Sequence, residues 1–242
     1  MQELLTLGTF GLRARDVGES EAILVQPKRL ALLVYLALAG RRRCRRRDQV
    51  VALFWPELDP QHARGALSQA LRHLRRSLGE GVLISQGEEE IGIDHQALWC
   101  DAVAFREACA AREFASALGC YKGRFLEGFF IPDAAPEFDQ WMDDQRTGLH
   151  QQATRAAAAL VESAERASEL AVAVEWAREA VRLAPIDETA VARLITLLDR
   201  SGDRAGALSC YDAFRKRMDA ELQAAPAPET QALVASIRRR QT

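Results

Sequence analysis

A segment in the second half of the chain recurs at an offset of 34 residues, and this repeat limits the possible folds more than any other feature. Residues 169–185 (ELAVAVEWAREAVRLAP) align with residues 203–219 (DRAGALSCYDAFRKRMD), so that Ala173 matches Ala207 and Ala177 matches Tyr211. A repeat of this length is one helical hairpin, which cannot bury its apolar face alone. We therefore expect a stack of helices in which the two alanines allow close approach.

Thirty-four residues is the tetratricopeptide period, and helix start and stop signals divide the second half of the chain accordingly. Asp101 is expected to cap the first of these helices. Residues 123–136 contain Gly128, Pro132 and Pro136 and are expected to be largely loop. The predicted helices cover residues 102–110, 113–122, 136–166, 169–184, 187–200, 204–222 and 229–240.

The first hundred residues predict a different arrangement. Alternating residues indicate one or two strands over 4–14 and another over 21–26. Three helices then follow, at 28–39, around Asp48 as far as Trp55, and at 61–78. Strands at 82–85 and 90–94 form a hairpin around Gly87. Three helices followed by a hairpin are the order of a winged helix, with the hairpin as the wing.

The predicted fold class is therefore mainly α, with two domains. Residues 1–97 form a winged helix-turn-helix with short β-strands, and residues 98–242 form an all-α tetratricopeptide-like domain. The charge is distributed unevenly between these parts. The chain as a whole carries −2, but residues 28–78 hold twelve Lys or Arg and three Asp or Glu, a net charge of +9. A local excess of this size indicates a polyanionic partner for that segment.

The helix at 62–78 is the best candidate for DNA contact. At 100° per residue, one face is apolar and is expected to be buried. That face consists of Ala63, Leu67, Ala70, Leu71, Leu74 and Leu78. No acid occurs between Gln61 and Gly79, whereas an ordinary solvated helix face mixes acids and bases for ion pairing.

The opposite face carries side chains that suit a DNA groove. Arg pairs with guanine and Gln with adenine, and both also hold phosphates. Gln69, Arg72 and Arg76 are the preferred contacts. Ser68 and His73 flank them, and Arg64 and Arg75 lie nearer the core boundary.

The run RRRCRRR at 41–47 has two interpretations. It is either a clamp for backbone phosphates or a solvated loop. Arg46 and Arg47 lie nearest the N-terminus of the second helix, which itself favours anions. We therefore expect Arg46 and Arg47 to contact phosphates.

The wing conflicts with simple DNA binding, because its tip is Glu88, Glu89 and Glu90. Three acids beside a DNA backbone would be repelled. An exposed polar turn is the favoured interpretation. Alternatively, the wing points away from DNA, meets a basic partner, or weakens DNA binding.

Motifs for catalysis are absent from the sequence. We find no GxxxxGK[ST], GxGxxG, HExxH or GxSxG pattern, and the four histidines have no ligand spacing. Five scattered cysteines without a CxxC pair favour free thiols in a reducing cytosol. Neither a secretory signal nor a membrane span is recognisable, so we expect a cytoplasmic protein that is not an enzyme.

Seven segments resemble one known family. They are LGTFGL (7–12), PKRLALLVYLAL (27–38), RRDQVVALFWP (46–56), ARGALSQALRHLRRSLG (63–79), WCDAVAF (99–105), GDRAGALSCYDAFRKRMDAEL (202–222) and PAPET (226–230). Together they resemble the antibiotic regulatory protein (SARP) type of bacterial transcriptional activators.

This resemblance implies a winged helix of the response-regulator output type, followed by a bacterial transcriptional activator domain. It also implies binding to double-stranded DNA at direct promoter repeats as a homodimer, contact with RNA polymerase, and no metal or cofactor. Two departures from the family matter. The acidic wing replaces the usual aromatic and basic residues, and the ATPase modules of larger relatives are missing from this sequence.

A second function deserves comparison: a tetratricopeptide-type protein-interaction adaptor whose winged helix is degenerate. Tetratricopeptide surfaces hold peptides or partner proteins. The acid-free helix at 62–78 separates the two hypotheses, because an adaptor has no reason to retain it.

Overall fold

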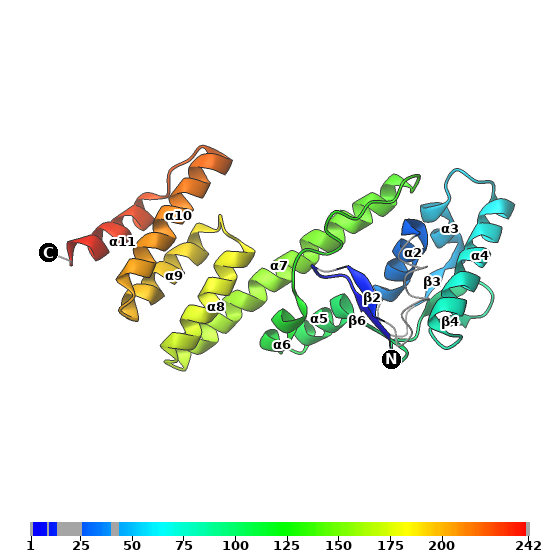
Figure 1. Ribbon diagram of the computed structural model, residues 1–242, viewed down its shortest axis with the longest axis horizontal. Helices are drawn as coiled ribbons and strands as arrows, with labels where there is room; N and C mark the ends of the chain where they lie inside the picture. The colour runs from blue at the N-terminus through cyan, green and yellow to red at the C-terminus, as the bar shows by residue number, and fades with distance from the viewer. Residues whose placement is uncertain (1, 9, 14–25, 40–43, 241–242) are drawn as a thin grey trace. The chain divides into compact units, whose positions relative to one another are not determined.

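The structure is a computed structural model that describes residues 2–8, 10–13, 26–39 and 44–240. Contacts divide the chain into two compact units, an N-terminal unit, Met1–Leu149, and a C-terminal unit, His150–Thr242. Figure 1 shows the strands gathered in the N-terminal unit, whereas the C-terminal unit is helical throughout its described part. This is the predicted fold class, mainly α with a few short strands before a helical region.

The first sheet of the N-terminal unit joins the start of the chain to residues about a hundred positions later. Its strands are β1 (Gln2–Leu5), β2 (Gly11–Arg13) and β6 (Leu98–Cys100). Strand β1 runs antiparallel to β2 and parallel to β6, in the order β2-β1-β6. The sequence did not predict β6, and the strand predicted at 21–26 falls almost wholly outside the described residues.

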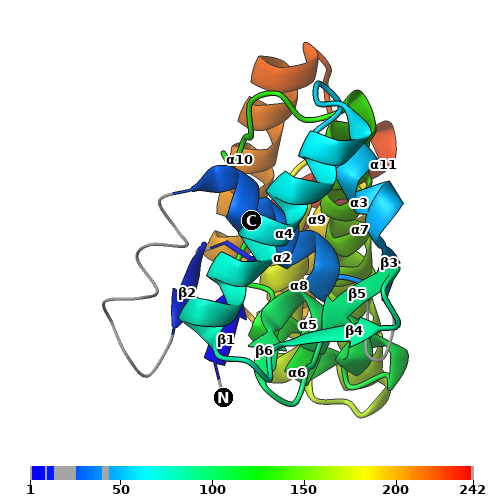
Figure 2. The same ribbon diagram turned by 90° about the vertical axis from the view of Figure 1, so that its right-hand side faces the viewer.

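The winged helix follows the predicted order. Its helices are α2 (Pro27–Ala37), α3 (Arg47–Phe54) and α4 (Pro60–Leu78). The wing strands β4 (Leu83–Gln86) and β5 (Glu90–Ile93) pair with each other, and β5 also pairs with β3 (Arg45–Arg46). Helix α2 lies against β5 as well as against α3 and α4 (Figure 2). The sequence did not predict β3, which lies inside the arginine run.

Local signals set the ends of α4. The Asp59 side chain accepts hydrogen bonds from the backbone N–H groups of Gln61 and His62, and Pro60 occupies the first turn, where no N–H is needed. Gly79 ends the helix with a φ of 91°, a conformation that strains any residue with a side chain. Both ends of the helix that carries the predicted DNA contacts are therefore fixed by local interactions.

The core of the N-terminal unit surrounds α2, where eight consecutive residues from Leu30 to Ala37 are buried. An aromatic cluster closes one side of it. The Phe54 ring lies 4.8 Å from that of Phe138, and the Tyr35 ring lies 4.9 Å from that of Trp141. Phe138 and Trp141 belong to α7 (Pro136–Arg166), so the first half of this helix packs on the winged helix.

The two compact units divide at Leu149, within α7. Strand β6, which pairs with β1, lies directly after the predicted boundary between residues 97 and 98. This boundary stays a prediction.

Between the winged helix and α7 lie two short helices and a loop. Helices α5 (Asp101–Ala110) and α6 (Phe114–Cys120) pack against each other. The loop that follows is held by Arg146, whose guanidinium donates to the backbone carbonyls of Phe125, Leu126 and Phe129. The expected loop at 123–136 is therefore ordered by hydrogen bonds from α7.

Asp101 has a different role from the one predicted. The residue before it, Cys100, is the N-cap of α5, and Asp101 occupies the first turn. Its buried carboxylate accepts hydrogen bonds from the backbone N–H groups of Thr6 and Leu7 and from the Thr6 hydroxyl, at 2.6–2.9 Å. The prediction that Asp101 is the N-cap was wrong, because Cys100 holds that position. The Asp101 carboxylate accepts from the Ala102 N–H of α5 and also ties the end of β1 to the start of α5.

The C-terminal unit confirms the repeat. Its helices after α7 are α8 (Leu170–Leu183), α9 (Glu188–Arg200), α10 (Arg204–Leu222) and α11 (Pro228–Arg239). Ala173 and Ala207, the matched small residues, are both fully buried in one apolar core with Ala177 and Tyr211. The matched positions are therefore buried together in the core of the helical unit, as expected for a repeat whose units stack.

The Asp101 carboxylate provides a test of this architecture. Burial raises the pKa of the Asp101 carboxyl, and the hydrogen bonds from Thr6 and Leu7 oppose part of that rise. Replacing Asp101→Ala leaves buried N–H groups without an acceptor. We expect the free energy of unfolding, measured in urea, to fall by about 3 kcal/mol.

Asp139→Asn is the control, because Asp139 is an exposed acid on α7. We expect its free energy of unfolding to stay within about 0.5 kcal/mol of the wild type. Equal stabilities of the Asp101 variant and this control would refute the role of Asp101.

Candidate nucleic-acid interface

Helix α4 separates its side chains as the sequence predicted. The six apolar residues of the predicted face are each at most 5% exposed. Five of the predicted contact residues, Arg64, Ser68, Gln69, Arg72 and Arg76, are exposed, and His73 is half-buried. The buried face therefore holds α4 against the core, while its polar face is open to a ligand.

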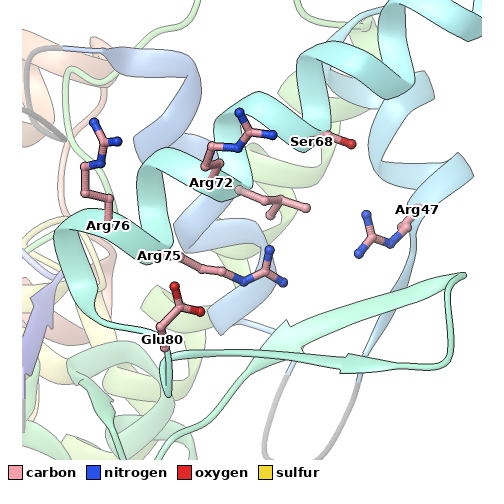
Figure 3. Close-up of a pocket in the computed structure, with 7 residues that line it drawn as sticks. Arg47, Ser68, Arg72, Arg75, Arg76 and Glu80 are labelled. Carbon is pink, nitrogen blue, oxygen red and sulfur yellow. The ribbon is translucent and has the colours of Figure 1, made fainter.

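A basic groove runs along the C-terminal half of α4. It is lined by Arg47, Ser68, Leu71, Arg72, Arg75, Arg76 and Glu80. Figure 3 shows Arg75 from α4 and Arg47 from the start of α3 reaching into the space between α4 and the wing hairpin. Four arginines and a single acidic residue thus line this groove.

The arginines of the basic groove have no acidic partner within 4 Å among the residues that the structure describes. Arg47 also has a buried Nε atom without a hydrogen-bond partner in the described part of the chain. The C-terminal unit differs, because its arginines commonly pair with acids, as Arg193 does with Glu165 and Arg240 with Asp199. Unpaired guanidinium groups gathered in one groove are suited to bind phosphate.

A second groove lies beside the N-terminal half of α4, and we call it the mixed groove. It is lined by Arg46, Arg47, Asp48, Arg64, Leu67, Ser68, Glu88 and Glu89. Two ion pairs lie in it: Arg64 with Asp48 at 3.2 Å, and Arg46 with Glu89 at 3.7 Å. All four side chains are largely exposed, so each pair is weak.

The arginine run has several roles rather than one. Arg41, Arg42 and Arg43 lie outside the described residues. The Arg45 guanidinium lies 4.7 Å from the centre of the Tyr35 ring, Arg46 pairs with Glu89, and Arg47 enters the basic groove. These three residues therefore have different surroundings, and phosphate contact by Arg46 and Arg47 stays a prediction.

Sequence reasoning underestimated two residues of this region. Arg75 was placed near the core boundary, yet its long side chain reaches the basic groove from a half-buried position. The inward packing of Arg45 had no local signal, because Tyr35 is distant in sequence.

The wing tip was expected to be an exposed polar turn. Glu89 is exposed, but Glu88 and Glu89 also line the mixed groove.

Other chemistry finds little support in the described part of the chain. No group of three or more His, Cys, Asp or Glu residues there is placed to hold a metal ion. Burial raises the pKa of the Cys100 thiol to about 12, and burial also raises the pKa of the Cys109 and Cys120 thiols. These thiols are therefore protonated at neutral pH. None of the described helices combines the length and apolar character needed to cross a bilayer.

Comparisons with known proteins point to one family. The family described as Bacterial transcriptional activator domain matches residues 100–238. The structure of Mycobacterium tuberculosis EmbR in complex with a low affinity phosphopeptide is similar over 100% of this chain, with a TM-score of 0.60 and 21% sequence identity. The chain spans 65% of the length of that EmbR chain, and the likeness shows a shared fold. A comparison with curated protein sequences gives no match.

The packing of Arg45 on Tyr35 can be tested by unfolding. Replacing Arg45→Ala removes both the cation above the ring and the apolar stem that covers it. We expect the free energy of unfolding in urea to fall by about 1–2 kcal/mol. In the control Arg46→Ala, which loses only an exposed ion pair, the fall should be at most about 0.5 kcal/mol. A ranking in the opposite order would show that Arg45 is not a structural residue.

Proposed function

The chain belongs to the bacterial transcriptional activator domain family, and on this premise we propose that it is a sequence-specific DNA-binding regulator that activates transcription. The family match, together with the shared fold, confirms the resemblance to SARP-type activators. DNA binding by this chain itself, and the surface that performs it, belong to the proposal.

One observation carries the proposal: the basic groove. Its four arginines lie on or beside a helix whose outward face has no acid, and they lack acidic partners among the described residues. Holding like charges together without counter-charges is unfavourable, and a polyanion relieves that cost. Double-stranded DNA supplies phosphates along a groove wide enough to admit an α-helix.

We propose that α4 enters the major groove. Gln69, Arg72 and Arg76 are exposed on its outward face and are proposed to contact base edges or the phosphates beside them. The secondary contacts proposed around them are Ser68, His73, Arg64, Arg46 and Arg47. Arg75 joins this set because it lines the same groove.

The rest of the chain is assigned by family resemblance. We propose that residues 1–97 bind DNA and that residues 98–242 mediate homodimer contacts on DNA and contact RNA polymerase. The activity requires no metal, cofactor or catalytic step, and it places the protein in the cytoplasm with the genome.

The adaptor alternative rests on the helical repeat of the C-terminal unit. It makes a different prediction about DNA affinity and its dependence on salt. An adaptor has no affinity for DNA at low salt, whereas a DNA-binding regulator shows an affinity that falls steeply as salt rises.

The test is a salt titration of DNA binding that compares the wild type with the double variant Arg72→Ala/Arg76→Ala. Duplexes selected from genomic fragments serve as ligands, and fluorescence anisotropy measures the dissociation constant between 50 and 200 mM salt, a range of about fourfold. We expect the double variant to bind roughly 30-fold more weakly at fixed salt. The slope of log K against log salt should also fall by about 1 to 2, because each lost phosphate contact lowers it by about 1.

The matched control is Arg155→Ala/Arg166→Ala, which changes the net charge equally at exposed positions of the C-terminal unit. We expect its binding to stay within about twofold of the wild type. Unchanged binding by the Arg72 and Arg76 variant would show that another face meets DNA. Absence of binding at low salt would refute DNA binding altogether.

A further inference from the structure

The tip of the wing is held beside α4 rather than extending freely into solvent. The backbone N–H of Arg47 donates to the Glu89 carbonyl at 2.8 Å, and Arg46 is the register partner of Glu90 across β3 and β5. These backbone contacts place Glu88 and Glu89 in the mixed groove, with Arg64 and Ser68 of α4. The negative charge of the wing therefore has a defined position on the candidate DNA-binding surface.

The two grooves share Arg47 and Ser68 but differ in charge. Three arginines line the mixed groove, and Asp48, Glu88 and Glu89 balance them. Four arginines line the basic groove against Glu80 alone. Positive charge available to a ligand is therefore concentrated on the C-terminal half of α4.

We propose that Glu88 and Glu89 lower the affinity of this protein for DNA by weakening the phosphate contacts of the mixed groove. This inference rests on the proposed function, since it concerns the same surface. Glu89 pairs with Arg46, and both glutamates place negative charge where a phosphate beside the N-terminal half of α4 would lie. The wing thus acts as a negative determinant of binding rather than as a second DNA contact.

The physical mechanism is sequence-independent. Repulsion between carboxylates and phosphates acts on any duplex, because the backbone is the same in all of them. The ion pair between Arg46 and Glu89 is exposed, with 61% and 80% of the two side chains accessible. Such a pair breaks easily, so loss of the glutamate charge frees Arg46 for a phosphate.

The experiment uses the full chain with Glu88→Gln/Glu89→Gln, which removes charge and retains side-chain size. Anisotropy titrations use a selected duplex and an unrelated duplex of equal length. One additional phosphate contact raises affinity about eightfold at 0.1 M salt and steepens the slope of log K against log salt by about 0.9. We expect a gain of roughly 5- to 10-fold, equal on both duplexes.

The matched control is Glu113→Gln/Glu127→Gln, which makes the same change in net charge at exposed positions that line neither groove. We expect its affinity to rise less than about twofold. Urea unfolding of both variants should match the wild type, since all four side chains are exposed. A gain of equal size in the control would overturn the proposal, because net charge alone would then explain the effect.

A double-mutant cycle with Arg46→Ala tests whether the gain in DNA affinity of the Glu88→Gln/Glu89→Gln variant depends on Arg46. Arg46→Ala should lower the affinity less in the wild-type background than in the Glu88→Gln/Glu89→Gln background, because the charge of Glu89 opposes a phosphate contact by Arg46. In the Glu88→Gln/Glu89→Gln background the same change should remove most of the gain. An equal loss in both backgrounds would overturn the pairing of Arg46 with the wing.

The failures of the two proposals are distinguishable. A wild type that binds DNA with a steep salt dependence, together with a wing variant that gains nothing or binds less tightly, overturns the role of the wing alone. A wild type without affinity at low salt overturns the proposed function, and the role of the wing falls with it.

Discussion

The N-terminal unit depends on the burial of one apolar helix. Eight consecutive residues of α2 are removed from solvent, so the helix has to be covered all round its circumference. Helices α3 and α4, strand β5, and the aromatic cluster formed with Phe138 and Trp141 supply that cover. Because α4 contributes its apolar face to this core, its opposite face has to point outward. The orientation of the candidate DNA-binding side chains is therefore a consequence of core packing.

Ion pairs neutralise some of the arginines on the outward surface and leave others unpaired. Arg64 is paired with Asp48 and Arg46 with Glu89, while the arginines of the basic groove have no acid within 4 Å among the described residues. The mixed groove and the basic groove, which lie beside the two halves of α4, thus present a neutral and a positive surface.

Long-range contacts decide which arginines are available to a ligand. Arg45 and Arg47 are two residues apart in the same run, yet Arg45 covers Tyr35 while Arg47 enters the basic groove. Arg45 belongs to β3, whereas Arg47 is the first residue of α3, so the change from strand to helix between them sends their side chains to different places. A similar long-range contact joins the ends of the winged helix, where Asp101 accepts hydrogen bonds from Thr6 and Leu7. Neither contact has a signal in the residues immediately around it.

The sequence by itself determined the elements and the faces of the helices. The three helices and hairpin of the winged helix, the buried face of α4 and the repeat that buries Ala173 and Ala207 all follow from local periodicity and end signals. The exposed positions of Gln69, Arg72 and Arg76 follow from the same periodicity. Only the tertiary structure decided the pairing of β1 with β6, the role of Asp101, the packing of Arg45 and the position of Glu88 and Glu89 beside α4. The physical reason is that helices and turns depend on residues a few positions apart. Strand partners, buried hydrogen bonds and ion pairs join residues that the sequence separates by tens of positions.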